Sequence, residues 1–179
     1  MAETEGDVTI RQVSATDAEA YRALRLQALL QAPEAFGASH ADEAARPLAA
    51  FIARITPAPP SLVFGAFAKA ELVGMAGFLA GNSEKNRHRG TLWGVYLAPD
   101  WRGRGIARAL VEAVRAHAAQ HVLVLQARAV TTNSVALRLY EQLGFKPYGI
   151  ESKALRIDGA LFDEALLALD FSEAEQVDG

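Results

Sequence analysis

Residues 102–107 carry the densest set of groups that could do chemistry in this chain of 179 residues. The segment contains Arg102, Gly103, Arg104 and Gly105, and it stands between an apolar run ending at Leu97 and an amphipathic helical pattern. The first amides of a helix lack partners within the helix and carry a partial positive charge, so they bind phosphate well. Glycines leave room for the ligand, and arginines add charge. The segment therefore predicts a pyrophosphate site.

Two nucleotide-binding patterns are excluded at this segment. It lacks the Gly-Lys-Ser/Thr ending of a P-loop, and it lacks the third glycine and downstream acidic residue of a dinucleotide-binding fingerprint. A tight turn with solvated arginines is the alternative interpretation of a glycine-rich segment taken by itself.

A family resemblance decides between these interpretations. Residues 102–107 resemble the acyl-CoA loop of the GCN5-related N-acetyltransferases (GNAT), which has the pattern Gln/Arg-x-x-Gly-x-Gly/Ala. A second segment resembles the family's Asn-x-x-Ala-x-x-Leu-Tyr-x-x-x-Gly-Phe pattern, through Asn133, Ala136, Leu139, Tyr140, Gly144 and Phe145. The order of elements over residues 8–169 is also similar, so the resemblance implies the GNAT fold: an α/β domain with a single mixed sheet of six to seven strands and about four helices.

The resemblance implies acetyl transfer from acetyl-CoA to a primary amine by direct attack in a ternary complex. It implies that backbone groups of residues 95–97 bind the pantetheine arm and polarise the thioester carbonyl, and that residues 102–107 hold the pyrophosphate. It also implies that Asn133 contacts the cofactor and that the Tyr140 hydroxyl protonates the leaving thiolate. The expected cofactor-binding residues are Val95, Tyr96, Leu97, Arg102, Gly103, Arg104, Gly105, Ile106, Ala107, Asn133 and Tyr140.

Two of these residues also fit ordinary structural roles. Tyr140 lies on the apolar stripe of its helix, where a core aromatic side chain is common. Asn133 stands where the helix begins, and asparagine is a favoured N-cap. The side chain of Asn133 could cap the helix and contact the cofactor at the same time.

The base that deprotonates the amine is left open by the sequence. Many family members have a glutamate on the strand before the cofactor loop, but Thr91 stands at that position, with Trp93 next on the same face. A water chain, His88 or Glu151 remain as candidates. The interpretation favoured for His88 is a solvated loop residue, and that for Glu151 is an exposed strand carboxylate, although Glu151 is the better placed of the two.

If the cofactor occupies the groove beside the strand that ends at Leu97, the amine must approach from the other side. The acceptor site is therefore expected in residues 29–45 together with the final hairpin around Glu151. Phe36 and Glu43 there, with Trp93, are the expected substrate-binding residues and would suit a cationic amine. Three functions remain open: acetylation of a small-molecule amine, which we favour; acetylation of a protein N-terminus or lysine; and a non-catalytic acyl-CoA-binding module.

Apolar periodicity predicts the elements that position these residues. Strands are expected at residues 8–13, 62–68, 72–79, 91–97, 122–127, 148–157 and 162–169, the last two joined at Asp158 and Gly159. Helices are expected at residues 17–30, 47–55 and 105–119 and from Asn133 onward. A loop containing Phe36 is expected between the first two helices.

Composition limits the remaining classes. Hydrophobic residues make up 51% of the chain and charged residues 22%, as in a single globular domain, here residues 8–171. Six acidic residues lie in residues 1–7 and 172–179, which we expect to be acidic tails, the first of them disordered. The body keeps about three excess positive charges, too few for a nucleic-acid surface.

Further classes are excluded by what the chain lacks. With no cysteine, disulfides, thiolate zinc sites and cysteine nucleophiles are impossible, and no histidine spacing indicates a metal. No apolar run is long enough for a membrane span, and the acidic start is unlike a secretory signal, so a cytoplasmic protein is expected. A homodimer is a possible assembly.

Overall fold

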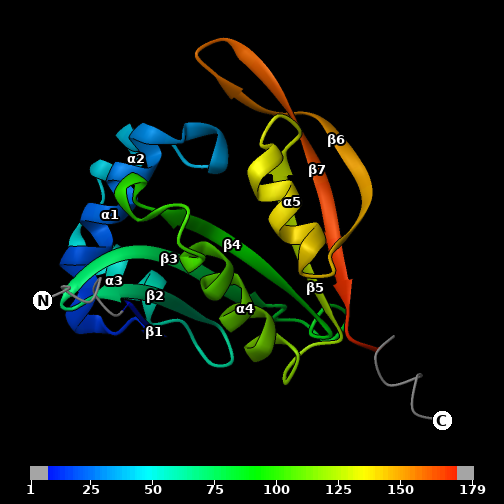
Figure 1. Ribbon diagram of the computed structural model, residues 1–179, viewed down its shortest axis with the longest axis horizontal. Coiled ribbons are helices and arrows are strands. Elements are labelled where there is room, and N and C mark those ends of the chain that lie inside the picture. Colours follow the sequence, from blue (N-terminus) through cyan, green and yellow to red (C-terminus); the bar gives the residue numbers. More distant parts are fainter. Residues whose placement is uncertain (1–7, 173–179) are drawn as a thin grey trace, which may run out of the picture.

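One seven-stranded mixed sheet forms the centre of the computed structural model, which describes residues 8–172 (Figure 1). The strand order is β1-β2-β3-β4-β5-β7-β6, and only the β4–β5 pair is parallel. The predicted tails lie outside the described residues, apart from Ser172. The strands are β1 (Val8–Gln12), β2 (Leu62–Ala68), β3 (Glu71–Ala80), β4 (Arg89–Leu97), β5 (Val124–Val130), β6 (Lys146–Ile157) and β7 (Ala160–Asp170).

Residues 8–172 contain five α-helices rather than about four: α1 (Ala18–Gln31), α2 (His40–Ala44), α3 (Leu48–Ile55), α4 (Ile106–Ala118) and α5 (Ser134–Gln142). The additional helix, α2, lies within the segment between the first two predicted helices, which was expected to be a loop. Ser39 starts it, because its hydroxyl accepts a hydrogen bond of 3.1 Å from the backbone N–H of Asp42. A helix of five residues is too short to show an apolar period in the sequence.

The two faces of the sheet carry separate hydrophobic cores. On one face, α1 and α3 pack with residues of β2 and β3, and Tyr21, Phe51 and Ile55 are fully buried there. On the other face, α4 and α5 pack with residues of β3, β4 and β5, around Leu110 and Leu125. The cofactor motifs predicted from the sequence begin α4 and form α5, whereas the predicted acceptor residues follow α1.

Strands β4 and β5 separate along their length. They pair only from Arg89 to Thr91 on β4 and from Val124 to Gln126 on β5, although the strands have nine and seven residues. Figure 1 shows them together at one end and diverging toward the other, between α4 and α5. Among the described residues, 92–97 of β4 therefore have no strand partner on the β5 side.

A β-bulge interrupts β4 within this unpartnered stretch. On the β3 side, Trp93 pairs with Gly77 and Tyr96 pairs with Met75, so two β4 residues, Gly94 and Val95, stand opposite one β3 residue. Gly94 has a φ of 63°, a backbone conformation that glycine adopts most readily. The bulge changes the direction of β4 just before its end at Leu97.

The final hairpin confirms the predicted turn. Asp158 and Gly159 both have positive φ, 47° and 83°, as a two-residue type I′ turn requires. Strand β5 differs from the expectation, since it starts at Val124 and continues to Val130. None of the helices within residues 8–172 is long and apolar enough to span a membrane.

Candidate functional site

The loop before α4 has the backbone that a phosphate site needs. Gly103 and Gly105 have φ values of 75° and 77°, and Gly105 is the residue that caps the helix. A Cβ atom at either glycine would meet no other atom within 4 Å, so the space above the loop is open. The amides that begin α4 are thus accessible to an anion, and the residues fit a pyrophosphate.

The arginines of this loop differ in how they are held. The Nε of Arg102 donates a hydrogen bond of 3.1 Å to the carbonyl of Leu97, which ties the loop to the end of β4. Arg104 donates to the carbonyl of Asp100 at 3.3 Å and lies over the Trp101 ring. Arg108, in the first turn of α4, pairs with Glu112 at 3.0 Å.

The three strand residues expected to meet the pantetheine arm begin within the bulge, at Val95. Val95, Tyr96 and Leu97 form the end of β4, on the edge that β5 does not cover. The side chains of Tyr96 and Leu97 are buried on opposite faces of the sheet, and the Tyr96 hydroxyl donates to Oε1 of Gln31 in α1. The backbone here is consequently held firmly while one of its edges stays unpaired.

Asn133 is the N-cap of α5. Its Oδ1 accepts a hydrogen bond of 3.1 Å from the backbone N–H of Ala136, which confirms the capping alternative. This bond uses the oxygen of the side chain and leaves its amide nitrogen for another acceptor. A contact to the cofactor through that nitrogen remains compatible with the capping role.

Tyr140 is buried within α5, with 6% of its surface exposed. Its ring packs on Phe145 at a centroid distance of 5.6 Å, and Gly144, with a φ of 95°, turns the chain so that Phe145 can make this contact. Burial raises the pKa of Tyr140 to about 12. The hydroxyl is therefore protonated at neutral pH, as a proton donor must be.

Glu43 is not an exposed acceptor-site carboxylate, and the expectation for this residue was wrong. It is 1% exposed, and both of its oxygens accept hydrogen bonds from Arg54 of α3. Arg46 and Arg25 lie at 3.6 Å and 3.9 Å. Hydrogen bonds from Arg54 are the main cause that lowers the pKa of Glu43. The sequence could not show this burial, because the arginines that cause it come from other elements.

Phe36 and Trp93 lie on the same face of the sheet as α1. The Phe36 ring is 6.5 Å from the Tyr96 ring, centroid to centroid, and 4.6 Å from the guanidinium carbon of Arg25. Trp93 is half-buried and crosses β3 at Gly77, where a Cβ would come within 2.2 Å of the indole. Phe36 thus lies beside Tyr96 of β4, and Trp93 lies against β3 at Gly77. The Glu43 side chain, in contrast, is buried.

The candidate bases lie in different places. Glu151 is half-exposed on β6, and its Oε2 accepts a hydrogen bond of 3.0 Å from Arg128 of β5. The same arginine nitrogen donates to Glu164, which faces Glu151 across the β6–β7 pair. The backbone carbonyl of His88 accepts bonds from the amides of Leu123 and Val124, where β4 and β5 meet.

The buried Arg25 of α1 was not identified from the sequence as a candidate functional residue. A signal for it exists on α1, because Tyr21, Leu24, Ala28 and Leu29 share its helical face and are buried. Helical periodicity could therefore have indicated that an arginine is buried on this helix.

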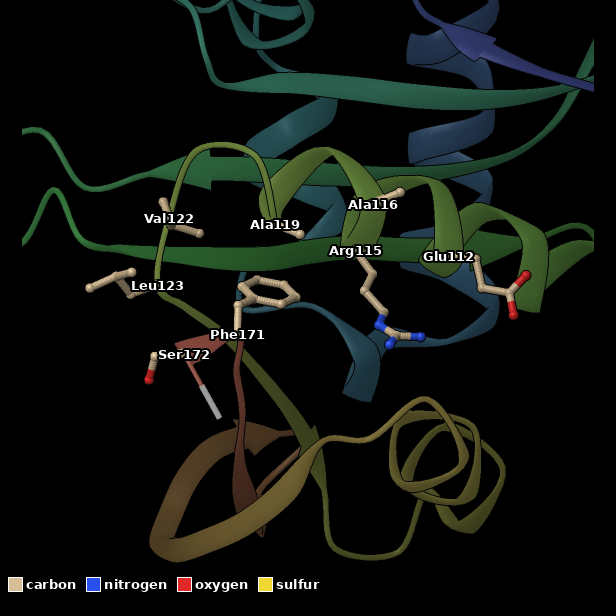
Figure 2. Close-up of a pocket in the computed structure, with 8 residues that line it drawn as sticks. All are labelled: Glu112, Arg115, Ala116, Ala119, Val122, Leu123, Phe171 and Ser172. Carbon is tan, nitrogen blue, oxygen red and sulfur yellow. The ribbon is translucent and has the colours of Figure 1, made fainter. Parts of the chain in front are cut away.

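A described pocket lies away from the glycine loop. It has a volume of about 620 Å³ and adjoins the second half of α4 (Figure 2). Its lining residues are Glu112, Arg115, Ala116, Ala119, Val122, Leu123, Phe171 and Ser172. Because Gly105 is at the other end of α4, this pocket is separate from the glycine loop.

Comparison with known proteins agrees with the geometry. The model of the acetyltransferase (GNAT) family matches residues 24–145. A GNAT-family acetyltransferase from Streptococcus pneumoniae has a TM-score of 0.78 and 20% identity, over 92% of this chain and 99% of its own. The Salmonella typhimurium protein yncA, solved with its cofactor acetyl-CoA, has a TM-score of 0.75 and 21% identity, over 92% and 94%.

A ribosomal-protein-alanine N-acetyltransferase from Brucella melitensis is also similar, with a TM-score of 0.76 and 23% identity over 90% of this chain and 99% of its own. No curated protein sequence matches the chain. At these identities the solved structures establish the shared fold.

Proposed function

Since the chain belongs to the acetyltransferase (GNAT) family, we propose that it transfers an acetyl group from acetyl-CoA to the primary amine of a small molecule, by direct attack in a ternary complex. The observation that carries this proposal is the open glycine loop at the start of α4, beside the edge of β4 that no strand covers. Acetyl-CoA supplies the acetyl group as a thioester, whose carbonyl carbon is open to attack by an amine.

Two groups of residues hold the co-substrate in this proposal. The loop from Arg102 to Ala107 binds the pyrophosphate through the first amides of α4 and the charges of Arg102 and Arg104. The backbone of residues 95–97 binds the pantetheine arm, and its N–H groups polarise the carbonyl. Asn133 donates its amide N–H to the ligand while its oxygen caps α5.

Tyr140 supplies the proton that the leaving sulfur needs. A phenol with a pKa of about 12 stays protonated through the working pH range. Because a free thiol has a pKa near 8.5, Tyr140 donates as negative charge develops on the sulfur and not before. Burial keeps water away from this donor, which strengthens its interaction with the developing charge.

The amine must be deprotonated before it attacks. For a lysine-like amine with a pKa of about 10.4, this costs roughly 4.6 kcal/mol at pH 7. Glu151 is the candidate base, and its Oε2 accepts a hydrogen bond from Arg128. A half-exposed carboxylate can pass the proton to solvent directly.

The test is acceptor profiling of the purified full-length chain with acetyl-CoA and a reagent that detects free thiols. The panel contains small amines, a lysine peptide and a peptide with a free N-terminal alanine. Turnover of small amines above both peptides supports the proposal. Preference for a peptide indicates a protein acetyltransferase, and calorimetric CoA binding without turnover on any acceptor indicates a binding module.

A further inference from the structure

Arg25 of α1 is a buried cation whose hydrogen bonds are incomplete. It is 6% exposed, and its Nε and Nη1 atoms are both buried and have no hydrogen-bond partner within the described residues. Buried guanidinium groups normally donate to acceptors, since a buried donor without one costs about 1–3 kcal/mol, and more when charged. Desolvation lowers the pKa of Arg25, in keeping with this unfavourable environment.

The part of the chain that the structure describes does not supply Arg25 with a close anion. Its nearest carboxylate is Glu43, whose Oε2 is 3.9 Å from the Arg25 Nε, beyond hydrogen-bond length. That carboxylate is already held by two nitrogens of Arg54 and by Arg46. One negative charge is thus shared among three arginines, and Arg25 has the weakest share.

The guanidinium of Arg25 is covered on its face, and its Nε and Nη1 atoms are buried along its edge. The Phe36 ring lies 4.6 Å from its central carbon, which satisfies the face through a cation–π contact. The N–H groups of a guanidinium point outward in its plane, so this contact leaves them without acceptors. A Cβ built on Gly94 would be in ordinary contact with Nη1, at 3.6 Å, and would meet no other described atom within 4 Å beyond its chain neighbours, so the space beside Gly94 adjoins this nitrogen.

The β4 bulge connects Arg25 with the proposed reaction. Gly94 directly precedes Val95, whose backbone begins the stretch that we expect to hold the thioester. The residue before it, Trp93, also has a buried N–H, Nε1, without an acceptor among the described residues. Unsatisfied donors therefore come from both α1 and β4 on the same face of the sheet, and what they lack is a group that accepts hydrogen bonds and carries negative charge.

We infer that the acceptor amine carries an anionic group, a carboxylate or a phosphonate or phosphate, and that Arg25 binds this group beside Gly94. The inference rests on the proposed function, since it names the class of acceptor for that site. Arginine binds such groups through two parallel N–H donors. An anion here would satisfy the free donors of Arg25 and balance the positive charge around Glu43, while the amine of the same molecule reaches the neighbouring backbone at Val95.

The test uses pairs of acceptors that differ only in the anion. L-phenylalanine is compared with phenethylamine, and aminomethylphosphonate with methylamine, which separates carboxylate from phosphonate. The variants are Arg25→Met, Arg25→Lys and the control Arg46→Met, which removes an exposed partner of the same glutamate. Calorimetry measures binding of CoA to each variant, and of L-phenylalanine and aminomethylphosphonate to each CoA-bound protein.

We expect the wild type to favour one anionic member over its partner by at least tenfold in kcat/KM. Arg25→Met should remove this preference and leave the anion-free amine within threefold, and Arg25→Lys should keep part of it, because lysine lacks the two-donor geometry. Arg46→Met should keep the full preference. If Arg25→Met does not fold, the inference is tested with Arg25→Lys: a partial loss of the preference for the anionic acceptor supports it, and an unchanged preference contradicts it.

Two results would overturn the inference and leave the proposed function intact: a wild type that binds CoA but does not prefer either anionic acceptor, or an Arg25→Met variant that loses activity equally on both members of a pair. Failure of the wild type to bind CoA would instead overturn the proposed function. In that case, binding of L-phenylalanine or aminomethylphosphonate that disappears in Arg25→Met would still support the anion site.

Discussion

The glycine loop before α4 and the charged cluster around Glu43 place their arginines in opposite environments. Around the loop, Arg102 and Arg104 are exposed, and Gly105 leaves open space above the first amides of the helix. In the cluster, Arg25 and Glu43 are more than nine-tenths buried and come from different helices. The loop has open space for an anion from solvent. The cluster already contains the carboxylate of Glu43, but three arginines share its single negative charge.

This difference determines what a substitution does in each region. A change at a glycine of the loop should weaken ligand binding and leave the fold intact, because a side chain at Gly103 or Gly105 would meet no other described atom within 4 Å of its Cβ. A change in the cluster should destabilise the protein, because a buried charge that loses its partner keeps its full desolvation cost. The following changes test whether binding and stability separate in this way.

The largest effect is expected for Gly105→Glu, which should remove detectable binding of CoA. The new side chain places bulk and negative charge where the helix amides would meet the pyrophosphate. Gly159→Glu is the matched control, since Gly159 also has positive φ and open space around its Cα, but lies in the β6–β7 turn. Calorimetry with CoA should show binding to the control only; equal binding to both folded variants would show that the loop is not the cofactor site.

Tyr140→Phe should lower turnover by about 10²- to 10⁴-fold while CoA affinity stays within threefold, because the ring and its packing on Phe145 remain and only the proton donor is lost. Tyr148→Phe is the control, since this tyrosine is 56% exposed and its hydroxyl accepts a bond from Gln126. Steady-state kinetics on the best acceptor provide the measurement. A loss below threefold would make Tyr140 a packing residue.

Glu43→Gln should lower the free energy of unfolding by about 3–5 kcal/mol, because it leaves the buried Arg25 and the partly buried Arg54 without a negative charge. Glu112→Gln is the control: it breaks an exposed pair with Arg108, for which about 0.3–0.5 kcal/mol is expected. Denaturant unfolding at pH 7 measures both. Similar values for the two variants would contradict the contrast between the regions.

Asp17→Asn tests the ion pair between Arg11 and Asp17, the residue that directly precedes α1. Hydrogen bonds from Arg11 hold the pKa of Asp17 far below its ordinary value of 3.8. A lowered folded-state pKa gives stability that is complete above the unfolded-state value and is lost as the pH falls toward the folded-state value. The variant should therefore be about 1–2 kcal/mol less stable at pH 7, with the difference shrinking below pH 3.8. A constant difference across pH would exclude the ion pair as its source.

The sequence predicted the parts of the molecule whose geometry is determined locally. The glycine loop before α4, the Asn133 cap and the Asp158–Gly159 turn all follow from a few adjacent residues, and the structure has each of them. The Glu43 cluster could not be predicted in this way, because burial of its carboxylate depends on how α1, α2 and α3 pack together. The β4 bulge at Gly94 was missed for the same reason, since its register depends on pairing with β3.

Glu151→Gln should have the smallest effect, although Glu151 is the candidate base. Its carboxylate is half-exposed and shared with Arg128, so water can take the proton from the amine when the carboxylate is replaced. We expect turnover to fall by less than tenfold and stability to change by less than about 1 kcal/mol, as for an exposed ion pair. Arg128→Gln is the matched control, because it removes the same ion pair and leaves the carboxylate in place. If Glu151 acts as the base, kcat/KM falls in Glu151→Gln and stays near the wild-type value in Arg128→Gln; equal values in both variants assign deprotonation to water.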